Sequence, residues 1–108
     1  MQIEASSRNG YEVLRIREDL SIRSNLSDLG TAIDTCIQRN ALNIAIIFTP
    51  ASHLYTRTIK TIVDCYKRLL RSGGRLAVVG PSQEIYDTMA TFGLTALISV
   101  FPTENDLH

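Results

Sequence analysis

Apolar positions along the chain form two patterns, short continuous runs and longer stretches with helical spacing. Residues 44–48 (IAIIF) are a wholly apolar run bounded by turn residues, which is typical of a strand buried on both faces. A second apolar run follows Gly73 and Gly74 at residues 76–79. Between the runs, after a loop at residues 49–58, apolar residues recur at helical spacing: Ile59, Ile62, Val63, Tyr66, Leu69 and Leu70. Strand, helix and strand in this order predict a βαβ unit with a right-handed crossover.

The N-terminal part predicts a hairpin and a first helix. Residues 2–6 alternate weakly and favour a short edge strand, and Asn9-Gly10 is a strong hairpin turn signal because both residues tolerate positive φ. Val13, Leu14 and Ile16 form the returning strand. A helix follows, capped by Ser24 or Asn25, with an apolar stripe on one side at Leu26, Leu29, Ile33, Cys36 and Ile37.

The C-terminal part predicts a third helix and a last strand. Gly80-Pro81-Ser82 is a turn that places Ser82 as the N-cap, and Gly93 stands where a left-handed C-terminal residue is wanted. Ile85, Met89 and Phe92 form the inner face of this helix. Ala96, Leu97, Ile98 and Val100 predict the last strand, and residues 103–106 a short final helix. The order β-β-α-β-α-β-α-β predicts one α/β domain over residues 1–108, with a mixed, mostly parallel sheet.

Composition and charge narrow the classes of partner. The chain has 108 residues, with 11 basic and 11 acidic side chains and therefore no net charge, which argues against nucleic acid as a partner. No apolar stretch approaches the roughly 20 residues needed to cross a bilayer, so we expect no direct membrane insertion. The N-terminus has no signal-peptide pattern. We therefore expect a cytoplasmic protein.

Candidate catalytic and metal-binding residues are few. Cys36 and Cys65 are isolated within predicted helices, and His53 has no partner at metal-ligand spacing. The phosphate-binding patterns GxGxxG and GxxxxGK[ST] are both missing. We therefore expect no cofactor, no metal and no enzymatic activity, although the glycine pair before residues 76–79 leaves an enzyme or nucleotide binder as a third hypothesis.

Two segments and the element order carry a family resemblance. Residues 67–79 (KRLLRSGGRLAVV) place Gly-Gly before an apolar strand, and Phe92-Gly93-Leu94 closes the third helix. This arrangement resembles the STAS domain, the fold of bacterial anti-sigma factor antagonists and stressosome scaffold proteins, from about Tyr11 to Leu107. The resemblance implies a STAS-like α/β fold and a non-enzymatic role in signalling and transcription regulation.

The resemblance also implies a position for a phosphorylation switch. The family carries an Asp-Ser-Ser-Gly or Asp-Thr type motif at the start of the second helix, where a partner kinase phosphorylates a hydroxyl. In register with Gly-Gly, that motif falls on Tyr55-Thr56-Arg57-Thr58. The usual acid, second serine and glycine are replaced, and Thr56 matches the first hydroxyl. Thr56 is therefore the first candidate phospho-acceptor and Thr58 the second; helix capping alone is the alternative for both.

The physical effect of such a phosphate follows from its position. On the first turn of a helix it would lie against unpaired backbone N–H groups, so the domain itself would accept it. Its charge of about −2 would instead disturb a partner packed over the loop. Arg57 and Lys60 would partly neutralise it.

The predicted partner surface lies around the loop before the second helix. It comprises Ser52, His53, Leu54, Tyr55, Thr56, Arg57, Lys60, Pro81 and Ser82, with residues 20–24 beside them. Leu54 is either an interface anchor or a core residue. A basic run along the second helix (Lys60, Lys67, Arg68, Arg71 and Arg75) is either a solvated face, with Asp64 pairing Arg68 or Lys60, or a contact surface for an acidic partner.

Two non-enzymatic functions are consistent with the resemblance. The first is an anti-sigma factor antagonist-like module that binds an anti-sigma factor, a serine kinase or other STAS proteins; a homodimer is also compatible with it. The alternative is an accessory subunit of a phospholipid ABC transporter, whose partner would be a membrane ATPase.

Overall fold

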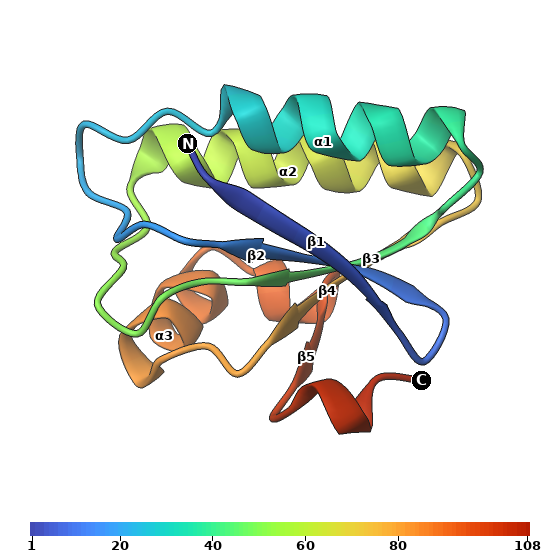
Figure 1. Cartoon of the computed structure of the whole chain (residues 1–108). Coiled ribbons are helices and arrows are strands. Elements are labelled where there is room, and N and C mark those ends of the chain that lie inside the picture. Colours follow the sequence, from blue (N-terminus) through green and yellow to red (C-terminus); the bar gives the residue numbers. More distant parts are fainter.

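A five-stranded sheet runs through the computed structural model, which describes residues 1–108 (Figure 1). The strands lie in the order β1-β2-β3-β4-β5; β1 pairs antiparallel with β2, and the remaining pairs are parallel. The predicted mixed, mostly parallel α/β arrangement is thereby confirmed. The elements are β1 Ile3–Arg8, β2 Tyr11–Ile16, α1 Ser27–Gln38, β3 Asn43–Ile47, α2 Thr56–Arg71, β4 Arg75–Val79, α3 Gln83–Thr91 and β5 Ser99–Phe101, with short 3₁₀ helices η1 Leu94–Ala96 and η2 Glu104–Asp106.

The hairpin between β1 and β2 turns at the predicted dipeptide. Asn9 and Gly10 have φ values of 51° and 84°, the left-handed pair that a two-residue hairpin turn requires. Arg8 therefore pairs with Tyr11, and the register runs back to Ile3 opposite Ile16. β1 is exposed along most of its length, which makes it the polar edge of the sheet.

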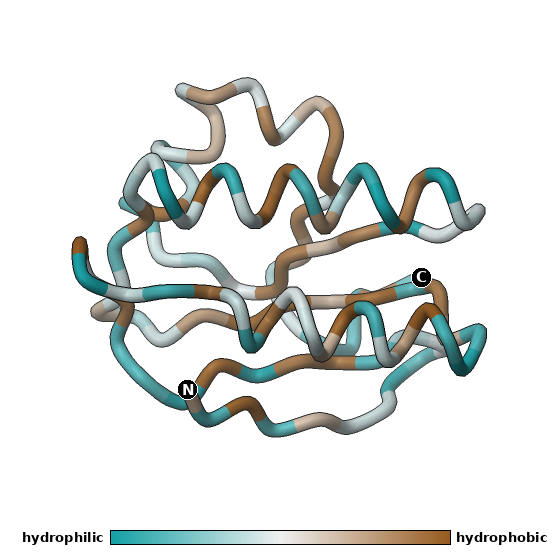
Figure 2. Tube along the Cα trace, turned by 90° about the horizontal axis from the view of Figure 1, so that it is seen from above, coloured by the Kyte–Doolittle hydropathy of each residue, from teal (hydrophilic) through white to brown (hydrophobic).

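The three α-helices cover the same face of the sheet. Each parallel strand is added beside the one before it, and right-handed crossovers that progress in one direction place every helix on one face. The buried sides of α1, α2 and α3 accordingly join one apolar cluster with Leu14, Ile46 and Val78. Apolar and polar positions alternate along the helices in Figure 2, as helices that cover a sheet require.

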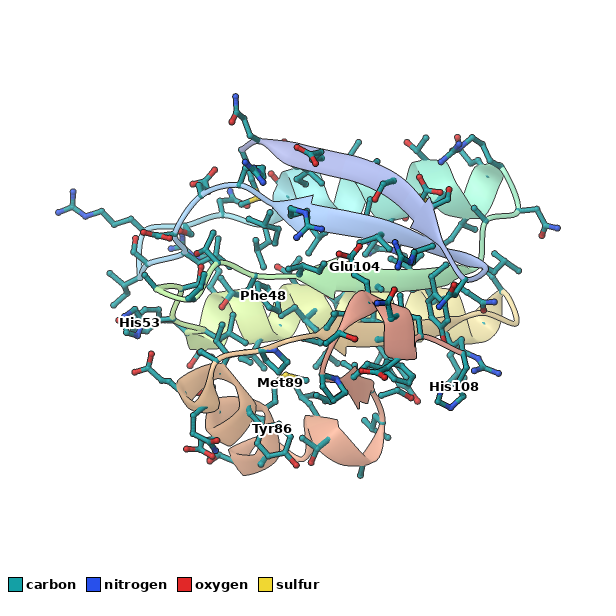
Figure 3. The ribbon with its side chains drawn as sticks, turned by 60° about the horizontal axis from the view of Figure 1, so that its bottom comes forward. Phe48, His53, Tyr86, Met89, Glu104 and His108 are labelled. Atoms are coloured by element: carbon teal, nitrogen blue, oxygen red, sulfur yellow. The ribbon has the colours of Figure 1, made fainter.

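The opposite face of the sheet carries small residues and is partly covered by the C-terminal segment. Val13, Ala45 and Ala77 are fully buried there in a second cluster that includes Phe101 and Leu107. The hydroxyl of Tyr11 donates a hydrogen bond to the carbonyl oxygen of His108, at 2.9 Å. Figure 3 shows η2, marked by Glu104, lying across this face.

Helix α1 begins later than predicted. Ser24 and Asn25 precede the helix, which starts at Ser27, and the buried Leu26 occupies the N-cap position. The side chain of Asn25 still has a capping role, because its Oδ1 accepts a hydrogen bond from the backbone N–H of Ser27 at 2.9 Å. Burial of Leu26 thus shifts the start of the helix without removing the local capping chemistry.

The segment after α3 also differs from the prediction. Gly93 has the expected positive φ of 74°, but the chain then forms η1, and β5 is only three residues long. The predicted strand from Ala96 was therefore wrong over its first half. Leu94, which is 2% exposed, directs this turn into the core.

Two apolar residues assigned to the core are exposed. Leu70 on α2 is 57% exposed and Phe92 after α3 is 51% exposed. The side of α2 that packs on the sheet is filled by Ile62, Cys65 and Leu69, so Leu70 lies beyond its edge. Both residues therefore remain as apolar surface.

The thiol of Cys65 offers a test of this packing. Burial raises its pKa to about 11, against the opposing effect of the Arg68 guanidinium. Because the thiolate is the nucleophile, roughly a thousandth of this thiol is reactive at pH 8. We expect iodoacetamide to leave Cys65 unmodified in the native protein and to modify it readily in urea, as peptide mass spectrometry would show. Ready modification under native conditions would contradict the packing.

Candidate functional site

The loops that follow β2, β3 and β4 leave the sheet at the same edge, where parallel strands present their carboxyl ends (Figure 1). The loop that follows β3 and leads into α2 runs from Phe48 to Tyr55. Phe48 is 5% exposed and anchors the start of this loop in the core, while Pro50 and Ala51 form an exposed turn. The backbone N–H of Ser52 closes this turn by donating a hydrogen bond to the carbonyl oxygen of Thr49, at 3.1 Å.

Ser52 joins this loop to the one that follows β2. Its buried hydroxyl accepts a hydrogen bond from the backbone N–H of Leu20 at 2.8 Å and lies 2.6 Å from the hydroxyl of Thr49. The neighbouring N–H of His53 donates to the carbonyl of Leu20 at 3.0 Å. The two loops are therefore fixed to each other by side-chain and backbone bonds.

Two residues assigned to the partner surface lie in the interior. Ser52 is 0% exposed, and Leu54, at 8%, belongs to the main apolar cluster with Ile59 and Leu20. Both residues are therefore not part of the surface that a partner would touch. They support that surface, because they hold the exposed His53 and Tyr55 in place.

The start of α2 is capped by Thr58. Tyr55 has an extended backbone, with φ −109° and ψ 170°, and the helix begins at Thr56. The hydroxyl of Thr58 accepts from the backbone N–H of Tyr55 at 2.9 Å and donates to its carbonyl at 2.7 Å. Thr58 is also only 1% exposed, so the structure assigns it to helix capping and places it out of reach as the second candidate phospho-acceptor.

Thr56, by contrast, is exposed at the first position of α2. Its hydroxyl takes no part in the hydrogen bonds that cap the helix. The first turn contains no acidic residue, so the positive end of the helix dipole has no carboxylate beside it. Arg57 and Lys60 are exposed next to it, as expected.

His53 connects this region to α3. Its Nδ1 contacts the carboxylate of Glu84 in the first turn of α3, and both side chains are about half exposed, at 51% and 59%. The ring of Tyr55, 40% exposed, lies beside that of His53 with centroids 6.5 Å apart. Ser82 is the N-cap of α3, accepting from the N–H of Ile85 at 3.2 Å, and Pro81 before it is partly buried.

Sequence reasoning did not single out two members of this region. Ile22 lies within residues 20–24, which were expected beside the partner surface, and it is 66% exposed; its signal is an isolated apolar residue in a polar Ser-Ile-Arg-Ser segment. Glu84 was not among the predicted surface residues, because its contact with His53 joins the loop before α2 to the first turn of α3 and follows no local pattern. We call the combined surface the rim surface; it consists of Ile22, His53, Tyr55, Thr56, Arg57, Lys60, Pro81, Ser82 and Glu84.

The basic run along α2 divides into two parts. Arg68 forms an ion pair with Asp34 of α1, with Nε 2.9 Å from the carboxylate oxygen, rather than with Asp64 as expected. Lys60, Lys67 and Arg71 are exposed and form no ion pair. The run is thus partly a helix-to-helix contact and partly unpaired charge.

A cavity of about 460 Å³ lies beside the rim surface, between the ends of β2, β3 and β4. It is lined in part by Arg15, Arg17 and Pro50. The guanidinium of Arg15 is held by Glu104 of η2 at 2.9 Å. No group of three or more His, Cys, Asp or Glu side chains comes together in the structure as a metal-binding cluster. No helix has the length and apolar character that a membrane crossing needs.

The hydroxyl of Ser52 predicts a measurable effect on stability. Replacing Ser52 with alanine leaves the buried N–H of Leu20 without its partner, which costs about 1–3 kcal/mol. We expect urea denaturation to show that loss, and hydrogen exchange to show faster exchange at Leu20 and His53. The Ser6→Ala variant on the exposed β1 strand is the control, and an equal effect there would contradict the role of Ser52.

Both the sequence and the fold have counterparts among known proteins. The family profile described as "STAS domain" matches residues 2–107. No curated protein matches the chain significantly. Among solved structures, the NMR structure of TM1081 is similar with a TM-score of 0.78 and 16% identity, covering 95% of this chain and 82% of that one. The crystal structure of the same protein, a putative anti-sigma factor antagonist from Thermotoga maritima, gives a TM-score of 0.77 at 16% identity, covering 94% and 86%.

A third solved structure is the phosphorylated form of SpoIIAA, a Bacillus cell fate determinant. Its TM-score is 0.66 at 20% identity, with 92% of this chain and 88% of that chain covered. At these identities the three similarities concern the fold. Each of the three covers more than nine tenths of this chain.

Proposed function

Since this chain belongs to the STAS domain family, we propose that it is a non-enzymatic signalling module that binds a partner protein through the rim surface. The observation that carries the proposal is the exposure of Tyr55, Thr56 and Arg57 on a loop whose buried neighbours Ser52 and Leu54 hold it rigid. A fixed surface with an exposed aromatic residue, and with the exposed Ile22 on the loop bonded to it, is suited to protein recognition, because aromatic residues are enriched in binding hot spots. An anti-sigma factor, a serine kinase or another STAS protein is the proposed partner.

Phosphorylation of Thr56 is the proposed regulation of that surface. The accessible hydroxyl, the uncompensated helix N-terminus and the adjacent Arg57 all support acceptance of a phosphate without unfolding. SpoIIAA, whose fold is similar, has a solved structure in its phosphorylated form, which is a further reason to test this position. A charge of about −2 in the middle of the rim surface would weaken the binding of a partner, because the charge has to be desolvated and repels acidic groups.

The Thr56→Glu variant tests the proposal. With tagged protein as bait in the native cell, we expect the wild type to retain a specific protein and the variant to retain roughly tenfold less, which is about 1.4 kcal/mol. The thermal midpoint should change little because Thr56 is exposed. Phosphosite mapping on the same samples should place any phosphate on Thr56 rather than Thr58.

Thr35→Glu is the matched control, since Thr35 is an exposed threonine on α1 away from the rim surface. Equal capture by the wild type and Thr56→Glu would remove the proposed switch. Retention of a membrane ATPase in place of a signalling protein would support the transporter alternative and overturn the proposed pathway.

A further inference from the structure

A second concave surface lies along α2, on the side opposite to its contact with α1. Residues of α2 line a groove that Phe92 closes from the end of α3, with a volume of about 270 Å³. Arg68, which pairs with Asp34 of α1, is not among the residues that line it. We call this the flank groove; its lining residues are Thr56, Ile59, Lys60, Val63, Asp64, Lys67 and Phe92.

The floor of the flank groove is apolar. Ile59 and Val63 are one helical turn apart on the same side of α2, and Tyr66 and Leu70 continue that line by steps of three and four residues. Of the apolar lining, Phe92 is 51% exposed and Val63 is half-buried, whereas Ile59 is buried; Leu70, beyond the lining, is 57% exposed. Phe92 and Val63 in the groove, and Leu70 beyond it, are therefore apolar side chains that the fold leaves uncovered.

The rim of the flank groove is positively charged. Lys60 and Lys67 both line it, and Arg71 follows Lys67 by one turn. None of these three takes part in an ion pair, and Asp64 is the only acidic residue in the lining. The positive charge is thus uncompensated within the molecule, although the whole chain has no net charge.

We propose that the flank groove binds an acidic amphipathic helix of a partner protein. One large apolar side chain of that helix would enter beside Phe92 and Val63, and its carboxylates would face Lys60 and Lys67. Pockets for drug-sized ligands run from about 300 to 1,000 Å³, so a groove of about 270 Å³ suits a side chain better than a cofactor. Helix-in-groove recognition uses anchors at this spacing, with charge pairs at the rim.

This inference extends the proposed function by naming the chemistry of a bound segment, and it rests on the chain being a protein-binding module. The flank groove ends at Thr56, where the rim surface begins. A partner that covers both would therefore meet the unpaired lysines and Thr56 in succession.

A peptide titration tests the flank groove directly. The probe is a synthetic helical peptide of about 18 residues, or five turns, with leucine at i, i+3, i+4 and i+7 and glutamate on the remaining positions. We expect titration into ¹⁵N-labelled protein to shift the NMR signals of Val63, Lys67 and Phe92. The Lys60→Glu/Lys67→Glu double variant should bind roughly tenfold more weakly or worse, and added salt should weaken binding to the wild type.

Controls separate recognition from bulk charge. Arg8→Glu/Arg17→Glu makes the same change of charge at exposed positions that form no ion pair, and it should bind as the wild type does. A scrambled peptide of the same composition should not bind. Equal binding of the scrambled peptide, or an equal loss in the control variant, would overturn the inference. Binding of the wild type to phosphatidylglycerol vesicles with no response to the peptide would also overturn it, in favour of an anionic membrane.

The capture experiment at the rim surface distinguishes the two proposals. If the peptide fails while the wild type still retains a partner and Thr56→Glu does not, the flank groove inference is wrong and the proposed function stands. If the peptide binds the flank groove while the rim variants change nothing in capture, the inference stands and the proposal that partners bind through the rim surface is wrong.

Discussion

Replacing Gly74 with alanine is expected to destabilise the protein strongly. A Cβ at this position would overlap the carbonyl oxygen of Leu42 and lie 3.0 Å from its carbonyl carbon and 2.9 Å from its side chain. The backbone cannot move aside easily, because the same carbonyl accepts a hydrogen bond from the N–H of Arg75 at 3.0 Å. We expect the free energy of unfolding to fall by about 3 kcal/mol or more. Thermal unfolding would show this as a lower midpoint, by about 4–8 °C for each kcal/mol lost.

Gly73 provides the matched control. It has a φ of 83°, and a Cβ there would meet no heavy atom within 4 Å. The Gly73→Ala variant should therefore cost only about 1 kcal/mol, the penalty of a left-handed residue. If the two variants unfold at the same temperature, the close approach between Gly74 and Leu42 is not what fixes this glycine pair.

Replacing Leu54 with alanine should reduce stability rather than act on binding alone. Leu54 is 8% exposed and packs in the main cluster, and truncating a buried leucine typically costs 2–5 kcal/mol, so we expect about 3 kcal/mol in urea denaturation. Its neighbour Tyr55 is 40% exposed, so Tyr55→Ala should change stability by less than about 1 kcal/mol. The capture experiment should show the reverse for Tyr55, with clear loss of the partner. A stable Leu54→Ala variant that no longer binds would return Leu54 to the interface.

The elements with strong local signals were predictable. Asn9-Gly10 specifies its turn through two residues alone, and the apolar runs of β3 and β4 are buried on both faces as their composition indicates. The order of these elements then determines the topology, because consecutive parallel strands with helical crossovers have few alternatives.

The details of the helices depended on contacts that no local pattern contains. Leu70 and Leu69 are equally apolar, yet one is 57% exposed and the other fully buried, since one residue rotates the side chain by about 100° around α2. Thr56 and Thr58 differ in the same way. The helical period predicts a stripe, but the neighbouring elements decide where its edges lie.

Long-range polar contacts were the least predictable part of the site. Ser52 contacts the backbone of Leu20 across 32 positions of the chain, and His53, a loop residue, contacts Glu84 on α3. Serine is common in loops for many reasons, so its residue type did not indicate a buried partner. Only the fold brings these atoms together.

The bond between Ser52 and Leu20 also bears on the speed of recognition. Two loops that are already joined when the chain folds do not have to search for one another when another molecule arrives, so little chain entropy remains to be lost. Association would then be governed by diffusion and orientation, and the lifetime of a complex by how fast it separates. A modification at the first residue of α2 would in that case act mainly by hastening release.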